Sequence, residues 1–247
     1  MKLIRLCTVV LAALCLAPAV FAEEGDPIST ETMIVDVPTA EVYDRYQASF
    51  LTRVYEHGTV MESIDFGVYP RINIGMSLAI DNWIGSSHSV KVLDPDFQAK
   101  WKVYDGSLYL PAVAIGYDGR RYGYGYDKHS RDYRGHRTKH YLDNRKGGYI
   151  TLTREIFTPG LSLTAGSNFS DFDWDEWYMF TGLYYKILPQ VNLLTEWDNI
   201  RNIRDSRLNM GARFYLHPSL ALDAAFRRIG RGDESERILQ LRYVTTF

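Results

Sequence analysis

The sequence predicts an all-β fold: a transmembrane, antiparallel, up-and-down β-barrel of about 12 strands. Three observations lead to this prediction. Apolar and polar residues alternate along most of the chain, short turns alternate with long polar loops, and the last strand ends on an aromatic residue. Mean hydropathy is −0.23, and beyond the first residues no apolar run reaches the roughly 20 residues that a membrane helix needs.

Residues 1–22 have the features of a cleaved signal peptide: a basic start, an apolar stretch and small residues at the cleavage point. Such a leader predicts export, and together with a barrel it predicts the bacterial outer membrane. The two cysteines, Cys7 and Cys15, both lie in the leader, so we expect no disulfide in the exported chain. Residues 23–40 are expected to form an N-terminal periplasmic segment, and residues 41–247 the barrel.

Alternation with a period of two is the main evidence for strands, because successive side chains of a strand point to opposite faces. In residues 72–81, INIGMSLAID, five large apolar residues share one face, and Asn, Gly, Ser, Ala and Asp share the other. Residues 207–216, RLNMGARFYL, repeat this pattern. Strands are expected over residues 41–55, 60–69, 72–84, 96–104, 107–117, 148–157, 160–169, 177–187, 190–199, 207–217, 219–228 and 236–247.

The connections between these strands alternate in length. Tight turns, rich in residues that favour turn dihedrals, are expected at residues 69–71, 105–106, 158–160, 188–190 and 217–219. Longer, charged loops are expected at residues 85–95, 118–147, 170–176, 200–206 and 229–235. Short turns at one end and long loops at the other are typical of an outer-membrane barrel, whose turns face the periplasm. With this number of strands, both chain ends fall on the turn side.

The apolar face of the predicted strands carries aromatic residues near both strand ends, as two interfacial girdles require. Those toward the long loops are Phe97, Trp177 and Trp197, and those toward the turns are Tyr185, Phe214 and Phe247. The last strand, RILQLRYVTTF, resembles the C-terminal β-signal of outer-membrane proteins, with Tyr243 and Phe247 as its assembly signal. A soluble barrel or sandwich is the alternative, but a closed barrel of about 12 strands is too wide for side chains alone to fill.

With the apolar face turned outward, the barrel interior is predicted to be polar and to carry both signs of charge. The pore-lining candidates are Asp65, Asp81, Lys100, Lys102, Glu196, Asp198, Arg213, Asp223, Arg227 and Arg242. Unpaired charges are not stable in a dry interior, which leaves two interpretations. The charges form an ion-pair network that closes the barrel, or they line a water-filled passage for polar solutes.

The long loop Asp118–Lys146 contains nine basic and four acidic residues, with tyrosines and glycines between them. Arginine and tyrosine pair with acidic groups and stack on sugar rings, so we expect this loop to bind a ligand. The candidates are Arg120, Arg121, Tyr124, Tyr126, Arg131, Tyr133, Arg134 and Arg137. Nucleic acid is not an expected partner. His136 and His140 are four residues apart, but the glycines and tyrosines around them disfavour a helix, so no metal site and no cofactor is predicted.

No enzymatic activity is predicted. The close serine and histidine residues, SSHSV at 86–90, lie in a loop with no acid positioned beside them. A hydrolase needs its nucleophile and its base within hydrogen-bonding reach of each other. Asp127 and His129 lie near each other in the basic loop, but a loop rich in both residue types produces such pairs by chance.

Several stretches of the chain resemble the YjbH-type outer-membrane barrel proteins. They are VPTAEV at 37–42, FGVYPRINIGMSLAIDNWIGS at 66–86, DPDFQAKWKV at 94–103, LPAVAIGYDGRRYGYG at 110–125, KGGYITLTRE at 146–155 and LLTEWDN at 193–199. The resemblance implies the barrel fold and the outer membrane, and larger members of that family are associated with exopolysaccharide production. This chain differs in being a single small barrel and in its long basic loop.

The resulting functional prediction is a passive pore, or an accessory, for polar, anionic or saccharide solutes, with a link to exopolysaccharide export. The alternative is a structural or adhesive barrel with a closed lumen, whose basic loop binds lipopolysaccharide or a partner surface. Expected partners are outer-membrane lipid, lipopolysaccharide, the outer-membrane assembly machinery and a polysaccharide.

Overall fold

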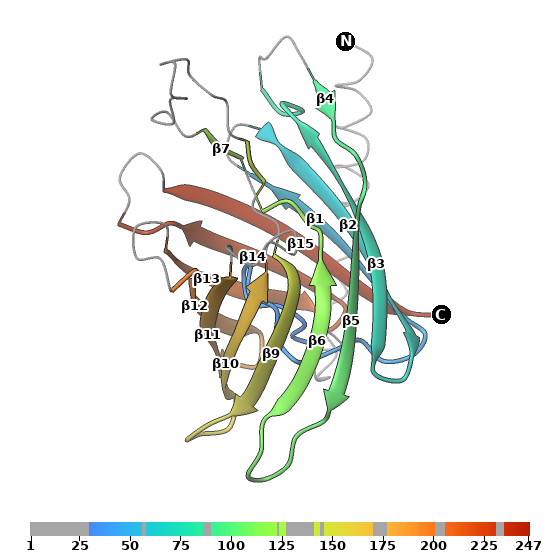
Figure 1. Cartoon of the computed structure of the whole chain (residues 1–247), viewed down its shortest axis with the longest axis vertical. Coiled ribbons are helices and arrows are strands. Elements are labelled where there is room, and N and C mark those ends of the chain that lie inside the picture. Colours follow the sequence, from blue (N-terminus) through green and yellow to red (C-terminus); the bar gives the residue numbers. More distant parts are fainter. Residues whose placement is uncertain are drawn as a thin grey trace.

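The computed structural model describes residues 30–55, 58–85, 90–122, 124–126, 141–143, 146–169, 177–200, 206–230 and 235–247, with the backbone alone for 124–126 and 141–143. These residues form a closed antiparallel β-barrel (Figure 1). Within the described ranges, no helix is long and apolar enough to cross a membrane.

Twelve strands make the wall of the barrel, and each pairs antiparallel with its neighbours. They are β1 (Gln47–Val54), β2 (Val60–Tyr69), β3 (Ile72–Asp81), β5 (Asp96–Tyr104), β6 (Ala112–Asp118), β9 (Gly147–Glu155), β10 (Leu161–Phe169), β11 (Trp177–Leu188), β12 (Val191–Asp198), β13 (Arg207–His217), β14 (Leu220–Arg227) and β15 (Glu236–Thr246). The ring closes because β1 pairs with β2 on one side and with β15 on the other. The predicted fold and strand number are therefore confirmed.

Most connections are shorter at one end of the barrel than at the other, as the sequence predicts. The tight turn expected at residues 105–106 and the strand expected from residue 107 are wrong, because residues 105–111 join β5 to β6. Two-residue turns lie at residues 70–71, 189–190 and 218–219. Three short strands belong to the long-loop end, where Figure 1 shows β4 and β7 beyond the wall. They are β4 (Lys91–Val92), which pairs with β3, and β7 (Tyr124–Tyr126), which pairs with β8 (Tyr141–Asp143).

Burial alternates along the wall strands with a period of two. In β3, Asn73, Ser77 and Ala79 are buried, whereas Ile74 and Met76 are exposed on the outer surface. The exposed outer set includes the aromatic residues predicted near the strand ends, Phe97, Trp177, Tyr185, Trp197, Phe214 and Phe247, and also Tyr243. An apolar surface of this extent around a polar interior is stable only against lipid or another apolar partner.

Both ends of the wall meet on the short-turn side. The Tyr46 N–H donates to the Gly67 carbonyl over 2.9 Å, and the Phe247 N–H donates to the Tyr46 carbonyl over 3.0 Å. β1 begins at Gln47, so the prediction that the first strand begins at residue 41 is wrong. Tyr46 has a φ of 71°, in the left-handed region, and at this residue the chain changes direction.

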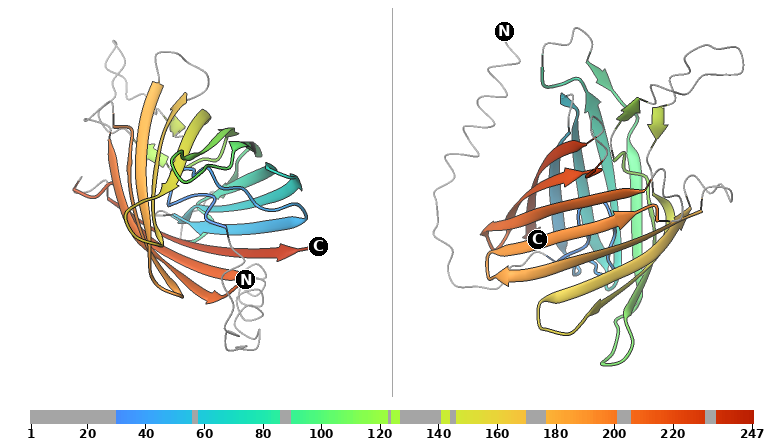
Figure 2. Two further views of the ribbon diagram at one scale, coloured as in Figure 1. Left: turned by 90° about the horizontal axis from the view of Figure 1, so that it is seen from below. Right: turned by 90° about the vertical axis from the view of Figure 1, so that its left-hand side faces the viewer.

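Residues 30–44, which we call the luminal segment, run inside the ring of strands, as the blue trace in the left panel of Figure 2 shows. Ile34, Val37 and Ala40 have no exposed surface. The prediction of a periplasmic segment over residues 23–40 is therefore wrong for residues 30–40, and residues 23–29 lie outside the described part. The physical reason is that the apolar and acidic side chains of this segment have complementary partners on the inner wall.

Candidate functional site: the luminal segment and its contacts

The luminal segment folds back on itself as a short hairpin inside the barrel. The Ile34 N–H donates to the Val37 carbonyl over 2.9 Å. Farther from the tip, the Thr39 N–H donates to the Thr32 carbonyl over 3.1 Å. These bonds shape the hairpin but do not position it, so its place in the barrel is determined by contacts with the wall.

The tip of the hairpin donates three backbone N–H groups to one carboxylate of the wall. The N–H groups of Val35, Asp36 and Val37 each lie 2.9 Å from an oxygen of Glu196 on β12. Asn209 on β13 donates a further hydrogen bond to the same carboxylate over 2.6 Å. Successive N–H groups that converge on one point form an anion-binding nest, and here a side chain of the wall fills the nest.

The side chain of Asp36 has the opposite role and binds two cations of the wall. Its Oδ1 accepts from Nη1 of Arg53 over 2.7 Å, and its Oδ2 lies 2.7 Å from Nε of Arg227. Burial alone would raise the pKa of the Asp36 carboxyl, but the guanidinium groups of Arg227 and Arg53 outweigh burial and lower this pKa. Because both arginines lie near the loop ends of β1 and β14, the hairpin tip points toward the long loops.

Two more carboxylates hold the arms of the hairpin. Glu31 forms an ion pair with Arg213 on β13 and accepts from Nδ2 of Asn192 over 2.7 Å. On the other arm, Oε2 of Glu41 lies 2.6 Å from Nζ of Lys102 on β5. Each arm is therefore fixed to the wall by its own ion pair.

Backbone carbonyls of both arms bind Lys100 on β5. Its ammonium nitrogen lies 2.7 Å from the carbonyl of Thr32, 3.1 Å from that of Thr39 and 3.0 Å from that of Glu41. An ammonium group has three N–H donors, so these contacts use its full donor capacity. One lysine thus ties the two arms together.

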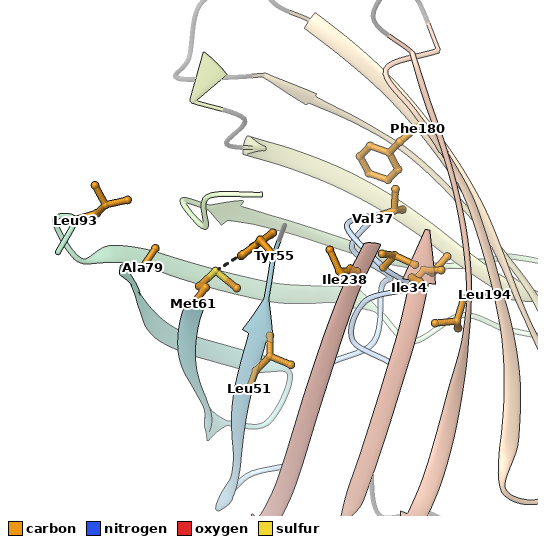
Figure 3. Packing of buried hydrophobic residues seen from close by; sticks show 12 residues of the cluster. Ile34, Val37, Leu51, Tyr55, Met61, Ala79, Leu93, Phe180, Leu194 and Ile238 are labelled. Atoms are coloured by element: carbon orange, nitrogen blue, oxygen red, sulfur yellow. Dashed lines mark hydrogen bonds between the residues drawn. The ribbon is translucent and has the colours of Figure 1, made fainter. Parts of the chain in front are cut away.

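Between these polar contacts, the hairpin packs three apolar side chains against the inner wall (Figure 3). Ile34, Val35 and Val37 are at most 2% exposed. The wall side of the cluster includes Leu51, Phe180, Leu194, Ala225 and Ile238. Gly182 on β11 leaves the space that Ile34 occupies, since a Cβ there would lie 2.4 Å from Cδ1 of Ile34. The cluster explains why a charged lumen has large apolar residues on its wall.

Four arginines line one side of the interior on four neighbouring strands. They are Arg213 on β13, Arg227 on β14, Arg242 on β15 and Arg53 on β1, each at most 1% exposed, and we call them the arginine wall. Asp223 and Glu236 on the same strands pair with two of them at 2.7 and 2.8 Å. Asp36 and Glu31 of the luminal segment supply two more carboxylates. Nη1 and Nη2 of Arg242 have no hydrogen-bond partner among the described residues.

All ten residues predicted to line a pore face the interior. Those that contact the luminal segment are Lys100, Lys102, Glu196, Arg213 and Arg227. The others with contacts to the wall or its loops are Asp65 with Arg120, Asp81 with Thr59, Asp198 with Lys146 and Asp223 with Arg213. Their predicted role in a passage stays a prediction, because protein fills this space in the state described.

The basic loop begins by folding into the barrel instead of standing above it. Arg120 donates to both carboxylate oxygens of Asp65 at 2.9 and 3.0 Å, and its predicted role in ligand binding stays a prediction. Arg121 donates to Asp96 over 2.9 Å, and Tyr122 is 1% exposed. Of the other candidates, Tyr124 and Tyr126 lie in β7, and Arg131, Tyr133, Arg134 and Arg137 lie outside the described residues.

A small cavity remains between the hairpin and the wall. Its volume is about 30 Å³, and Met33, Asp65, Lys100 and Tyr149 are among the residues that line it. A space of this size holds on the order of one water molecule and is too small for a sugar. In the part of the chain that the structure describes, no cluster of His, Cys, Asp or Glu is suited to a metal ion.

The luminal segment was not predicted, although the sequence contains three signals for it. Acidic residues recur at positions 31, 36 and 41, with no basic residue from 30 to 44. The stretch TMIVDVPT at 32–39 joins an apolar run to turn-forming residues. Finally, Phe180, Leu194 and Ile238 are large apolar residues at inward positions of their strands, which a purely polar lumen does not explain.

No protein-family model matches this chain, and no curated protein matches it. Solved structures of porins are similar in fold. The KdgM porin has a TM-score of 0.51 at 7% identity, over 80% of this chain and 98% of that chain. The KdgM porin in complex with disordered oligogalacturonate has a TM-score of 0.50 at 9% identity, over 81% of this chain and 99% of that chain. At these identities the likeness shows the fold alone, which is that of a porin-like barrel.

Proposed function

We propose that this chain is a porin-like barrel of the bacterial outer membrane that passes polar anionic solutes, acidic saccharides among them. In the state described, the luminal segment closes the passage. One observation carries the proposal: the interior is filled by a hairpin from the N-terminal part of the chain, and not by side chains of the wall alone. A hairpin can leave the lumen without the wall being rebuilt.

The size and polarity of the wall support a passage. The interior side chains of an eight-stranded barrel just fill its lumen, and this barrel has twelve strands. Polar interiors of transmembrane barrels are water-filled unless a loop or a helix plugs them. Removal of the luminal segment is therefore expected to leave a hydrated lumen.

The arginine wall supports anions as the solutes. Once the luminal segment is withdrawn, four buried guanidinium groups face two wall carboxylates, Asp223 and Glu236. Arginine binds carboxylates through paired N–H donors. One of the similar solved porins is in complex with oligogalacturonate, an acidic saccharide, which supports the same class of solute here.

The resemblance to YjbH-type proteins adds exopolysaccharide as a candidate for the solute. This link remains a proposal, as do export through the signal peptide, assembly through Tyr243 and Phe247, and contact with lipopolysaccharide.

Planar-bilayer conductance of two forms of the chain tests the proposal. The first form is unaltered, and the second lacks residues 31–40 but keeps Tyr46, whose hydrogen bonds with Gly67 and Phe247 join the segment to the wall. We expect rare openings or none from the unaltered chain, and steady conductance with a preference for anions from the deletion variant. Heat-modifiable migration on gels checks that both forms are folded.

A folded and inserted deletion variant that stays silent would contradict a passage. That outcome would favour the alternative of a structural barrel that is closed by its own ion pairs.

A further inference from the structure

The luminal segment occupies the arginine wall as an acidic ligand would. It pairs with wall cations through three carboxylates, those of Glu31, Asp36 and Glu41, which are spaced five residues apart. No basic residue lies between positions 30 and 44 to offset this charge. We propose that the segment is a built-in mimic of a linear, carboxylate-bearing polymer, and that such a polymer displaces it from the arginine wall. This inference rests on the proposed function, because displacement of the segment serves to open the proposed passage.

Because the arginines are buried, replacement of the luminal segment by an anionic ligand is more favourable than departure of the segment alone. A buried guanidinium without a counter-ion is destabilising. If the hairpin leaves, Arg53 loses both Asp36 and the Val35 carbonyl, and Gln240 remains as its side-chain acceptor within the described ranges. A carboxylate of an incoming polymer offers the same acceptor atoms as Asp36. The closed state therefore opens at least cost when another anion takes the place of the segment.

Arg242 offers such a ligand one more guanidinium group once the luminal segment is withdrawn. Its side chain is 1% exposed, and its Nη1 and Nη2 have no hydrogen-bond partner among the described residues. Arg242 pairs in register with Leu51 of β1 and Ala221 of β14, and so lies within the same arginine wall. Because Arg242 is buried in the closed state, an acidic group reaches it only after the luminal segment has moved aside. The displaced state therefore offers a ligand one more cation than the luminal segment itself uses.

Glu196 favours the return of the segment once the ligand has gone. Its carboxylate accepts three N–H groups from the hairpin tip and one hydrogen bond from Asn209. When the hairpin leaves, the Glu196 carboxylate loses these three backbone donors, and its negative charge repels an anionic ligand. Glu196 therefore binds the luminal segment and not an anionic ligand, whereas the arginine wall binds any polymer with suitably placed carboxylates.

A single introduced cysteine measures displacement directly. Val37 has no exposed surface. The two native cysteines, Cys7 and Cys15, lie in the predicted signal peptide, so Val37→Cys supplies the single thiol of the processed chain, which intact mass verifies. The measured quantity is the rate at which a neutral maleimide modifies this thiol at fixed ionic strength, with alginate oligomers or with maltohexaose. Val90→Cys, at an exposed position outside the wall strands, is the matched control for reagent reactivity.

Alginate oligomers are linear polymers of uronic acids. We expect them to raise the modification rate of the V37C thiol by roughly tenfold or more. The reason is that a ligand that binds only the displaced state shifts the population toward that state. Neutral maltohexaose leaves the rate unchanged, and neither sugar affects V90C. Adding Asp36→Asn raises the V37C rate without any ligand and reduces the further increase with alginate. Glu31→Gln acts in the same direction and replaces Asp36→Asn if that variant does not fold.

An unchanged V37C rate with saturating alginate, or an equal increase with maltohexaose, overturns the mimicry. The conductance experiment separates this failure from failure of the proposed function. If the variant lacking residues 31–40 conducts while V37C ignores alginate, the passage stands and the mimicry is wrong. If V37C responds while the deletion variant is silent, the segment is a ligand-sensitive switch in a barrel without a passage.

Discussion

The barrel wall and the luminal segment are held in place by different interactions. Each wall strand is bonded along its backbone to two neighbours, and β1, for example, pairs at eight positions with β15 and at seven with β2. The luminal segment depends on side chains of the wall, chiefly Arg53, Arg227, Glu196 and Lys100. Its release breaks no ladder between strands. The difference indicates that the segment can open locally at a lower free energy than the wall unfolds.

Arg53→Met should have the largest effect, and the effect should be confined to the luminal segment. Arg53 donates to Gln240, to Asp36 and to the Val35 carbonyl. Removal of one partner of a buried ion pair costs about 3–5 kcal/mol, which corresponds to amide exchange at least ~100-fold faster. Hydrogen-exchange mass spectrometry of peptides covering residues 33–39 measures the effect.

Arg45→Met is the matched control for this substitution. Arg45 is exposed, and its guanidinium carbon lies 4.5 Å from the ring centre of Tyr46, outside the lumen contacts. We expect no change in exchange of the luminal segment in this variant. If amide exchange in β14 and β15 of Arg53→Met became faster by the same factor as in the luminal segment, the wall and the segment would unfold together.

Met76→Lys tests the other side of the comparison, the outer face of the wall. Met76 lies in the middle of β3 and is exposed among apolar neighbours. A lysine on the lipid face near the middle of a bilayer costs about 2–4 kcal/mol. Denaturant titration of folding into liposomes should show this loss for Met76→Lys and little loss for Met76→Leu. Equal stability of both variants would mean that lipid does not cover this face.

Glu196→Ala should have an intermediate effect on the tip of the hairpin. The substitution leaves the N–H groups of residues 35–37 without their acceptor. A buried donor without a partner costs about 1–3 kcal/mol, so exchange of these three amides should become ~10–100-fold faster. Glu62→Ala is the control, because Glu62 faces outward and accepts from Thr52 over 2.8 Å. Unchanged protection of residues 35–37 in Glu196→Ala would refute the role of this carboxylate.

Lys102→Ala should have the smallest effect. Its ion pair with Glu41 is partly accessible to solvent, with side chains that are 13% and 29% exposed. Partly exposed pairs contribute about 1 kcal/mol or less, so amide exchange of the segment should change by a few-fold at most. Lys100→Ala, which removes three hydrogen bonds to both arms, should have a larger effect in the same measurement. The reverse order would show that the ion pair at Glu41 is the stronger anchor.

The wall was largely predictable from the sequence. Residues 72–81 and 207–216 lie in β3 and β13 with the predicted inward and outward faces. Period-two alternation is a property of each strand, so it can be recognised without knowledge of the strand's neighbours. The first strand was predicted too long because residues 41–46 share the apolar and polar mixture of a strand but turn into the lumen at Tyr46.

The candidate site was predictable only in part. Arg213, Arg227 and Glu196 were recognised as inward residues, while Arg53 was not among the candidates. Their partners were not predicted, since Asp36 and Glu196 are 160 residues apart in the chain. Arg120 is among the ligand-binding candidates of the sequence, but its pairing with Asp65 was not predicted, because that pairing depends on where the loop enters the barrel.

The sequence by itself determined which residues face outward and which face the interior, because side-chain direction follows from alternation along each strand. Only the tertiary structure decided what fills that interior. The luminal segment acquires its partners after β1, β5, β12, β13 and β14 have come together around it. Contacts of that kind join distant positions through single side chains, and no local pattern in the chain specifies them.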